Sequence, residues 1–206
     1  MAKLKSTLPN MVIVLSVIAA VTSLALAYVY SITKEPIAQA QIQKLNAAIS
    51  EVVPGLEEFK EYKVPIFDAS GKVSDSLTFY DVYKDGVIIG TAVNAYDKDG
   101  FSGLIKVMVG FDTLGNTIKS LPLEQNETPG LGDKLERNKS KFTHQFDTIN
   151  LAKVNLKVKN DGGDIDAITA ATISSRAYCR AIKQAYDAYT ANKQIKEEGG
   201  EDETVE

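Results

Sequence analysis

The chain has 206 residues, enough for one globular domain with an appendage, and its 44% hydrophobic content suffices for a single core. A formal net charge of −4, without a basic patch, argues against nucleic acid as a partner. One cysteine and one histidine exclude an internal disulfide and a metal site built from several such side chains, so no metal site is expected.

The first predicted element is an apolar run at residues 11–32 that carries no charged side chain. A helix of that length measures about 33 Å, which matches the roughly 30 Å hydrocarbon core of a membrane. Lys3 and Lys5 precede the run. By the positive-inside rule, residues 1–10 then stay in the cytoplasm. We expect a single-pass anchor in the inner (cytoplasmic) membrane, with the remainder on the periplasmic side.

A cleaved signal peptide is the alternative for this segment. Ala25, Leu26 and Ala27 form a small-x-small pattern of the kind found at cleavage sites. The apolar run is longer than a typical signal core, and it continues past this pattern into Tyr28 and Tyr30, which suit a membrane interface. These features favour an uncleaved anchor.

A second, juxtamembrane helix is predicted at residues 33–55. Pro36 suits the first turn of a helix, and Pro54 with Gly55 suits its end. Apolar residues recur between them at near-helical spacing: Ile37, Ile42, Leu45 and Ile49. We expect this helix to carry an apolar stripe onto the domain that follows, at residues 56–192.

The domain's central pattern indicates an antiparallel β-meander. Four runs of β-type composition follow one another, at residues 77–83, 87–96, 103–112 and 117–124. The expected turns lie at residues 84–86, 98–100 and 114–116, and Asp85-Gly86 is a strong hairpin signal. In the third run, Ile105, Val107 and Val109 alternate with Lys106, Met108 and Gly110. One face should therefore pack while the other is at least partly free.

Less regular sequence follows the meander. The stretch ETPGLG, residues 127–132, places two glycines around a leucine, which permits close backbone approach to a flat ligand, while Pro129 stiffens the loop. On this hexapeptide alone, an ordinary surface turn is the favoured interpretation. Residues 150–158 are a candidate for a further strand.

The stretch DAITAATISS, residues 166–175, holds four hydroxyl side chains: Thr169, Thr172, Ser174 and Ser175. Helix capping uses one or two hydroxyls, and no capping box exists, because no Glu or Gln lies three residues after either threonine. A helix start with spare hydroxyls is also a place to hold a phosphate group. Capping and phosphate binding are both compatible with this stretch.

An amphipathic helix is predicted next, and the buried residues expected on it are Ala177, Ile182, Ala185 and Ala188. Residues 193–206 are rich in glutamate and are expected to form a disordered acidic tail. The predicted fold class is α+β: one N-terminal transmembrane helix, then a domain with an antiparallel β-meander and flanking helices.

Residues 166–172 resemble the flavinylation motif of the FMN-binding domain family, which reads Asp, two residues, Ser or Thr, Gly, Ala, Thr. In that family a flavin transferase, using FAD and magnesium, joins FMN through its phosphate to the last threonine. The resemblance implies a covalent FMN phosphoester at Thr172. Ala170 stands where glycine is commoner, and an alanine would be strained there if the backbone needs a positive φ.

Two further stretches strengthen the resemblance: residues 127–132 are similar to the family's flavin-lining loop, and residues 100–112 to the strand before it. The resemblance implies that more residues contact FMN: Thr169, Ala171, Ser174, Ser175, Glu127, Thr128, Gly130, Leu131 and Gly132. No side chain is expected to be catalytic, because the cofactor carries the redox chemistry.

Size and the single anchor resemble the G subunits of Rnf complexes, which move electrons between ferredoxin and NAD and couple this to ion transport. The resemblance implies an electron-carrying flavoprotein that works with other membrane and peripheral subunits and catalyses nothing alone. One alternative is the C subunit of the sodium-pumping NADH:quinone oxidoreductase, and another is a non-redox membrane-anchored scaffold. A flavoenzyme acting alone is disfavoured, because the only acidic candidates for a general base are Glu127 and Asp166.

Overall fold

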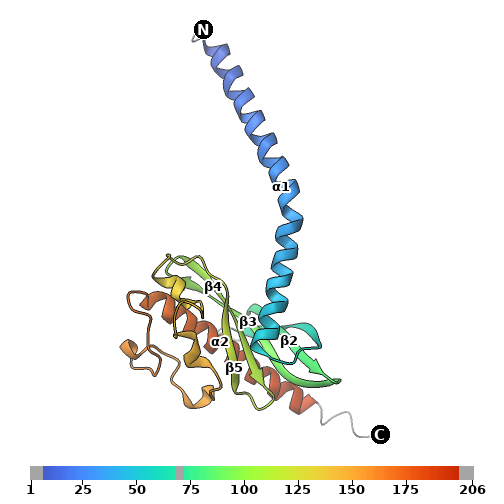
Figure 1. Ribbon diagram of the computed structural model, residues 1–206, viewed down its shortest axis with the longest axis vertical. Coiled ribbons are helices and arrows are strands. Elements are labelled where there is room, and N and C mark those ends of the chain that lie inside the picture. The colour runs from blue at the N-terminus through green and yellow to red at the C-terminus, as the bar shows by residue number, and fades with distance from the viewer. Residues whose placement is uncertain (1–6, 68–71, 200–206) are drawn as a thin grey trace. The chain divides into compact units, whose positions relative to one another are not determined.

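The computed structural model describes residues 7–67 and 72–199, which fall into two compact units, residues 1–44 and 45–206. The lysines at positions 3 and 5 and the last part of the expected acidic tail, residues 200–206, lie outside the described residues. The first unit contains most of helix α1, and the second contains its end, a five-stranded sheet and helix α2 (Figure 1).

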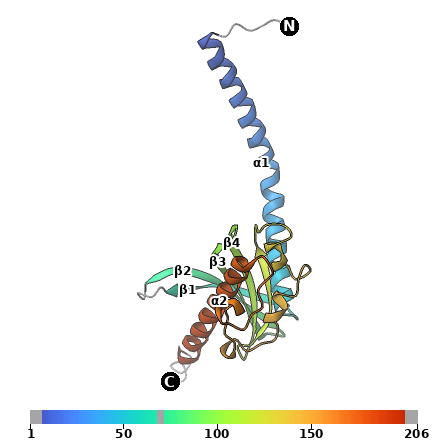
Figure 2. The same cartoon turned by 90° about the vertical axis from the view of Figure 1, so that its left-hand side faces the viewer.

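Helix α1 is a single element, Leu8–Val52, where the sequence predicted two helices (Figure 2). Pro36 lies inside it. A proline removes one backbone hydrogen bond from a helix, but no glycine accompanies it between residues 33 and 52, so the surrounding sequence continues the helix. Among the described residues, α1 is the one helix long and apolar enough to cross a membrane.

Only the end of α1 packs in the second unit. Ala48, Ile49 and Val52 are buried there. Two members of the predicted apolar stripe, Ile37 and Ile42, are 54% and 58% exposed instead. The stripe therefore begins to pack only at its last members.

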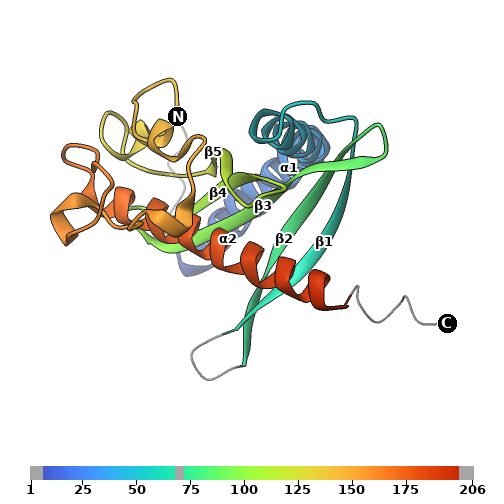
Figure 3. The ribbon, with the colours of Figure 1, turned by 90° about the horizontal axis from the view of Figure 1, so that it is seen from below.

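The sheet has strand order β1-β2-β3-β4-β5, and every neighbouring pair is antiparallel (Figure 3). Its strands are β1 (Glu58–Phe67), β2 (Val73–Lys84), β3 (Val87–Gly100), β4 (Gly103–Asp112) and β5 (Thr117–Glu124). The four-stranded meander is confirmed, and β1 is an addition at the edge. Pro65 obscured its alternation of Tyr62, Val64 and Ile66, yet an edge strand tolerates a proline.

The hairpin turns match the sequence in two places and differ in one. Asp85 and Gly86 both have positive φ, 50° and 77°, as a type I′ turn requires. The second turn does not lie at residues 98–100: Gly100 still pairs with Gly103, and Phe101 and Ser102 form the two-residue tip. This shift places the Phe101 side chain beside the site described below.

Both faces of the sheet are covered, so the expectation of a partly free face is wrong at the middle of β4. Helix α2 packs over Ile105, Val107 and Val109. The end of α1 packs over Met108 on the other face. A Cβ atom at Gly110 would lie 2.3 Å from the Val52 carbonyl oxygen, so glycine is what allows this approach.

Short 3₁₀ helices connect the sheet to α2: η1 (Gly132–Leu135), η2 (Thr143–Phe146), η3 (Leu151–Lys153) and η4 (Lys159–Asp161). No strand forms at residues 150–158 of the described chain, apart from a single bridge between Val158 and Ile165. The Asn150 side chain accepts a hydrogen bond from the Ala152 amide and caps η3, which competes with an extended conformation.

Helix α2 (Thr172–Gly199) buries the predicted residues Ala177, Ile182, Ala185 and Ala188. It continues seven residues past the expected boundary at residue 192, so residues 193–199 are helical and the disordered tail does not begin at residue 193. The Lys196 ammonium lies 2.8 Å from the Asp81 carboxylate on β2, and this contact ties the last turns of the helix to the sheet.

Candidate functional site

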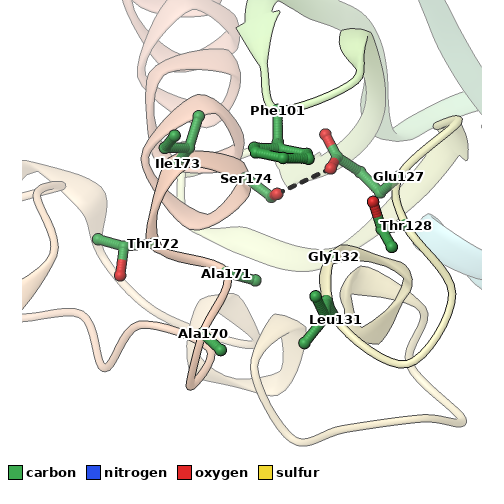
Figure 4. Close-up of a pocket in the computed structure, with 10 residues that line it drawn as sticks. All are labelled: Phe101, Glu127, Thr128, Leu131, Gly132, Ala170, Ala171, Thr172, Ile173 and Ser174. Atoms are coloured by element: carbon green, nitrogen blue, oxygen red, sulfur yellow. Dashed lines mark hydrogen bonds between the residues drawn. The ribbon is translucent and has the colours of Figure 1, made fainter.

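A cavity lies where three segments that are distant in sequence meet: the β3–β4 hairpin tip, the loop at residues 127–132 and the start of α2 (Figure 4). Its lining residues are Phe101, Glu127, Thr128, Leu131, Gly132, Ala170, Ala171, Thr172, Ile173 and Ser174. The fold therefore brings together most of the site residues predicted from the two motifs.

The start of α2 presents unused hydrogen-bonding groups to this cavity. The first helical hydrogen bond runs from the Ser175 amide to the Ala171 carbonyl oxygen (3.0 Å), so the three amides before it have no acceptor within the helix. Thr172 is half-buried, and no described residue makes a hydrogen bond with its hydroxyl. These groups, at the positive end of the helix, suit an anion such as a phosphate.

Ser175 and Thr169 lie outside the cavity lining. The buried Ser175 hydroxyl donates to the Ala171 carbonyl oxygen (3.0 Å) and accepts from the Ile168 amide (2.9 Å). These bonds fasten the turn before α2, but the hydroxyl accepts from none of the first-turn amides, so Ser175 does not provide the helix cap that the sequence left as one alternative. The Thr169 side chain is exposed.

The turn before α2 holds Ala170 in the left-handed region, with φ of 63°. The Ala171 amide donates to the Ile168 carbonyl oxygen (3.0 Å) and closes this turn. A left-handed conformation costs a residue with a Cβ atom about 1–2 kcal/mol. This is the position at which the related motif has glycine, so the alanine is accommodated here with strain.

A second turn shapes the loop at residues 127–132. The Leu131 amide donates to the Thr128 carbonyl oxygen (3.1 Å), and Pro129 and Gly130 occupy the two central positions. Gly130 has φ of 80°, which a type II turn requires at its third residue. Gly130 therefore shapes the turn without lining the cavity, whereas Leu131 lines it.

Glu127 links all three segments. One of its carboxylate oxygens, Oε2, accepts a hydrogen bond from the Ser174 hydroxyl at 3.0 Å. The other, Oε1, accepts one from the Ser102 amide at 3.3 Å. The side chain is buried, so the ETPGLG loop, the hairpin tip and α2 are joined inside the wall of the cavity.

Large apolar side chains complete the walls. Phe101, Leu131 and Ile173 are 66%, 41% and 47% exposed and border the same cavity. No lysine is among the described residues that line it. The site thus combines an apolar surface suited to a flat aromatic ring with a helix N-terminus suited to a phosphate, and these two features fit a flavin mononucleotide.

Phe101 and Ile173 are lining residues that the two motifs did not reveal. The turn was predicted at residues 98–100, which would have left Phe101 between that turn and the strand predicted at residues 103–112. The available signal was the pair Gly100 and Gly103 around a two-residue tip, as in a short hairpin loop. Ile173 follows the motif threonine directly, and a single apolar residue at a helix start carries no signal of its own.

Comparison with known proteins gives two family matches. Residues 100–187 match the FMN-binding domain family, which covers the hairpin tip, both motifs and most of α2. Residues 1–52 match the RnfG N-terminal region, which covers helix α1. The chain therefore has the two parts of one recognised architecture in the same order.

Relatives resemble the chain over most of its length. A protein of Aliivibrio fischeri is 32% identical over 92% of this chain and 93% of its own length. One from Shewanella baltica is 33% identical over 78% of this chain and 79% of its own length. One from Vibrio cholerae is 30% identical over 88% of this chain and 90% of its own length. Each is named as the G subunit of an ion-translocating oxidoreductase complex. This chain belongs to the family of ion-translocating oxidoreductase complex G subunits, with an FMN-binding domain at residues 100–187.

Proposed function

We propose that this protein is the electron-carrying flavoprotein subunit of an Rnf-type membrane complex, with FMN joined through its phosphate to Thr172. The observation that carries this proposal is the half-buried Thr172, whose hydroxyl has no hydrogen-bond partner among the described residues. It lies beside the free amides of α2, in a cavity that the ETPGLG loop completes. The name that the relatives share supports membership in a redox complex.

Each group of cavity residues has a distinct task in this proposal. The free amides at the start of α2 hold the phosphate and keep it next to the threonine oxygen. Phe101, Leu131 and Ile173 cover the ring and exclude water from it. Bound FMN supplies one- and two-electron redox chemistry, while the protein binds it, orients it and adjusts its potential. The phosphoester leaves the flavin ring itself unmodified.

The wider assignment follows from the family. Helix α1 anchors the chain as a single-pass membrane protein, and other subunits of the complex connect the flavin to ferredoxin and NAD. A flavin transferase loads the cofactor after export. The C subunit of the sodium-pumping quinone reductase remains the alternative redox assignment, but the relatives are named as G subunits.

Intact mass and in-gel flavin fluorescence of denatured protein test the covalent link. The full chain is expressed with a flavin transferase in an exporting host. The wild type should gain the mass of one FMN less one water and fluoresce, and Thr172→Ala should do neither. Thr113→Ala is the matched control, because Thr113 is exposed and lies outside both the cavity lining and the flavinylation motif, and it should load normally. An unmodified wild type would overturn the covalent assignment and favour the scaffold alternative.

The periplasmic position of the FMN-binding domain has its own test. Cys179 is 1% exposed, so it gives little background with thiol reagents. Leu114, at the turn between β4 and β5, is 80% exposed and suits replacement by cysteine. A membrane-impermeant maleimide should label Leu114→Cys in intact cells. Labelling that requires disruption of the inner membrane would place the domain in the cytoplasm.

A further inference from the structure

Glu127 is a buried carboxylate that only neutral groups contact. Its residue surface is 6% exposed, and the groups that donate to its two oxygens are the Ser102 amide and the Ser174 hydroxyl. No lysine, arginine or histidine of the described chain forms an ion pair with it. Its two oxygens therefore each accept one hydrogen bond, and both donors are uncharged.

The backbone leaves a space shaped for this carboxylate. A Cβ atom at Gly100 would lie 2.8 Å from Glu127 Oε1, and one at Gly132 would lie 2.6 Å from Oε2. Neither distance is tolerated between such atoms without a shift of the structure. Gly132 therefore makes room for the Glu127 side chain, whereas Gly100 is also required by the Gly103 carbonyl oxygen, which would lie 2.4 Å from its added Cβ atom.

The position of this charge has an electrostatic consequence. Glu127 lines the cavity that holds the flavin in the proposed function (Figure 4). Charges interact more strongly in a water-poor cavity than in bulk water. An electron that enters the flavin ring without a proton adds one negative charge close to the carboxylate, and this repulsion disfavours the reduced form. A cation beside Glu127 would cancel the effect, but both of its donors are neutral.

Resting on the proposed function, we propose that Glu127 lowers the reduction potential of the flavin bound in this cavity. Ser174 moderates the effect, because its hydroxyl donates to Oε2 and partly compensates the charge. Glu127 thus acts as an electrostatic determinant of the electron-transfer step and donates no proton in it. The electron comes from a one-electron donor of the complex and leaves to its one-electron acceptor.

Redox titration of the loaded full-length protein tests this inference, with dithionite as reductant, redox dyes as mediators and flavin absorbance as the readout. Glu127→Gln keeps the shape and removes the charge. At a given applied potential, this variant should have a ratio of reduced to oxidised flavin at least tenfold higher than the wild type. For a one-electron step, that corresponds to a rise of about 59 mV in the reduction potential. Glu124→Gln, which removes a charge from the exposed end of β5, is the matched control and should leave the potential unchanged.

Ser174→Ala separates electrostatics from a structural disturbance. It keeps the carboxylate and removes a donor, so the potential should fall, opposite to the effect of Glu127→Gln. Loosening of the site would move both potentials in the same direction and would overturn the inference, as would an unchanged potential in Glu127→Gln. If Glu127→Gln does not fold, a lower potential in Ser174→Ala than in the unchanged Glu124→Gln control supports the inference, and an equal or higher potential overturns it. A wild type that holds no flavin would overturn the proposed function itself, and this inference with it.

Discussion

Each end of helix α2 lies beside a buried carboxylate, but the two carboxylates have different kinds of partner. At its C-terminal end, Asp81 is 6% exposed and accepts hydrogen bonds from Tyr62 (3.1 Å), Thr91 (2.8 Å) and the Lys196 ammonium (2.8 Å). At its N-terminal end, Glu127 is equally buried, yet only an amide and a hydroxyl contact it. A buried charge normally needs a charged partner, so the second arrangement is the costly one.

The difference separates a region that stabilises the fold from one that serves a ligand. The C-terminal end satisfies its polar groups with the chain's own residues. The N-terminal end carries free amides, a strained Ala170 and exposed apolar side chains such as Phe101. Each of these features reduces stability, and the free amides and the apolar side chains suit a phosphate and an aromatic ring. Substitutions at one end should therefore change stability, and those at the other should change cofactor loading.

The largest effect is expected for Gly132→Ala at the cavity end. The new methyl group would lie 2.6 Å from Glu127 Oε2 and 2.9 Å from the Ser174 hydroxyl oxygen. We expect a loss of about 1–3 kcal/mol in the free energy of unfolding and a strong decrease in FMN loading. Urea unfolding and flavin fluorescence measure the two effects.

Gly130→Ala is the control for this substitution. Its Cβ atom would meet nothing within 4 Å, although its φ of 80° imposes strain of about 1 kcal/mol. It should therefore load FMN while losing some stability. Normal loading in Gly132→Ala would show that the wall around Glu127 yields and would weaken the contrast between the two ends.

Asp81→Ala tests the C-terminal end. It leaves the Tyr62 and Thr91 hydroxyls without their acceptor and removes the charged partner of the Lys196 ammonium, which still donates to the Tyr62 hydroxyl. We expect the free energy of unfolding to fall by about 1–3 kcal/mol while FMN loading stays normal. Lys196→Ala should cost less than about 1 kcal/mol, because that side chain is 52% exposed and solvent screens its charge. Loss of loading in a folded Asp81→Ala protein would contradict the division of roles.

Alkaline pH should weaken the C-terminal end. Burial, reinforced by the Asp112 charge, raises the pKa of Tyr189 to about 12. Burial also raises the pKa of Tyr62. An unfolded tyrosine has a pKa of about 10 and loses its proton first, so this contribution to stability is complete below about pH 10 and is lost as the pH rises toward about 12.

Urea unfolding at roughly pH 8 and pH 11 measures this loss. Tyr189→Phe removes one of the titrating groups. It should therefore reduce the difference between the free energies of unfolding at the two pH values, by at most about 1.4 kcal/mol per pH unit. The variant also loses the hydrogen bond to the Asp112 carbonyl oxygen (2.9 Å), so it should be less stable than the wild type at pH 8. An unchanged pH dependence would mean that Tyr189 does not contribute to it.

The smallest effect is expected for Ala170→Gly. Glycine relieves about 1–2 kcal/mol of left-handed strain but adds about 0.5–1 kcal/mol of unfolded-state entropy. The net gain in unfolding free energy should thus lie between about 0 and 1.5 kcal/mol, with covalent loading retained. Ala171→Gly is the matched control: it removes a buried methyl group and should destabilise the protein. A loss of stability in Ala170→Gly would show that the turn holds no strain.

The sequence alone determined the local elements, because each depends on a short periodic pattern or on a turn residue. The apolar run at residues 11–32 predicted the membrane-length part of α1, and alternation with Asp85-Gly86 predicted the central strands and a hairpin turn. The two motifs at residues 127–132 and 166–172 predicted which segments meet at the site. These signals lie within a few residues of one another, so no knowledge of the fold is needed to detect them.

The tertiary structure decided the contacts between residues that are distant in sequence. Helix α1 continues through Pro36, which as a single residue had suggested a helix start. The register of β3 and β4 places Phe101 at the cavity, and the packing of α2 brings Ser174 to Glu127. The same packing continues the helix past residue 192, so that the Lys196 ammonium donates a hydrogen bond to the Asp81 carboxylate. Such pairings arise because register and packing minimise the free energy of the whole chain, which no local pattern encodes.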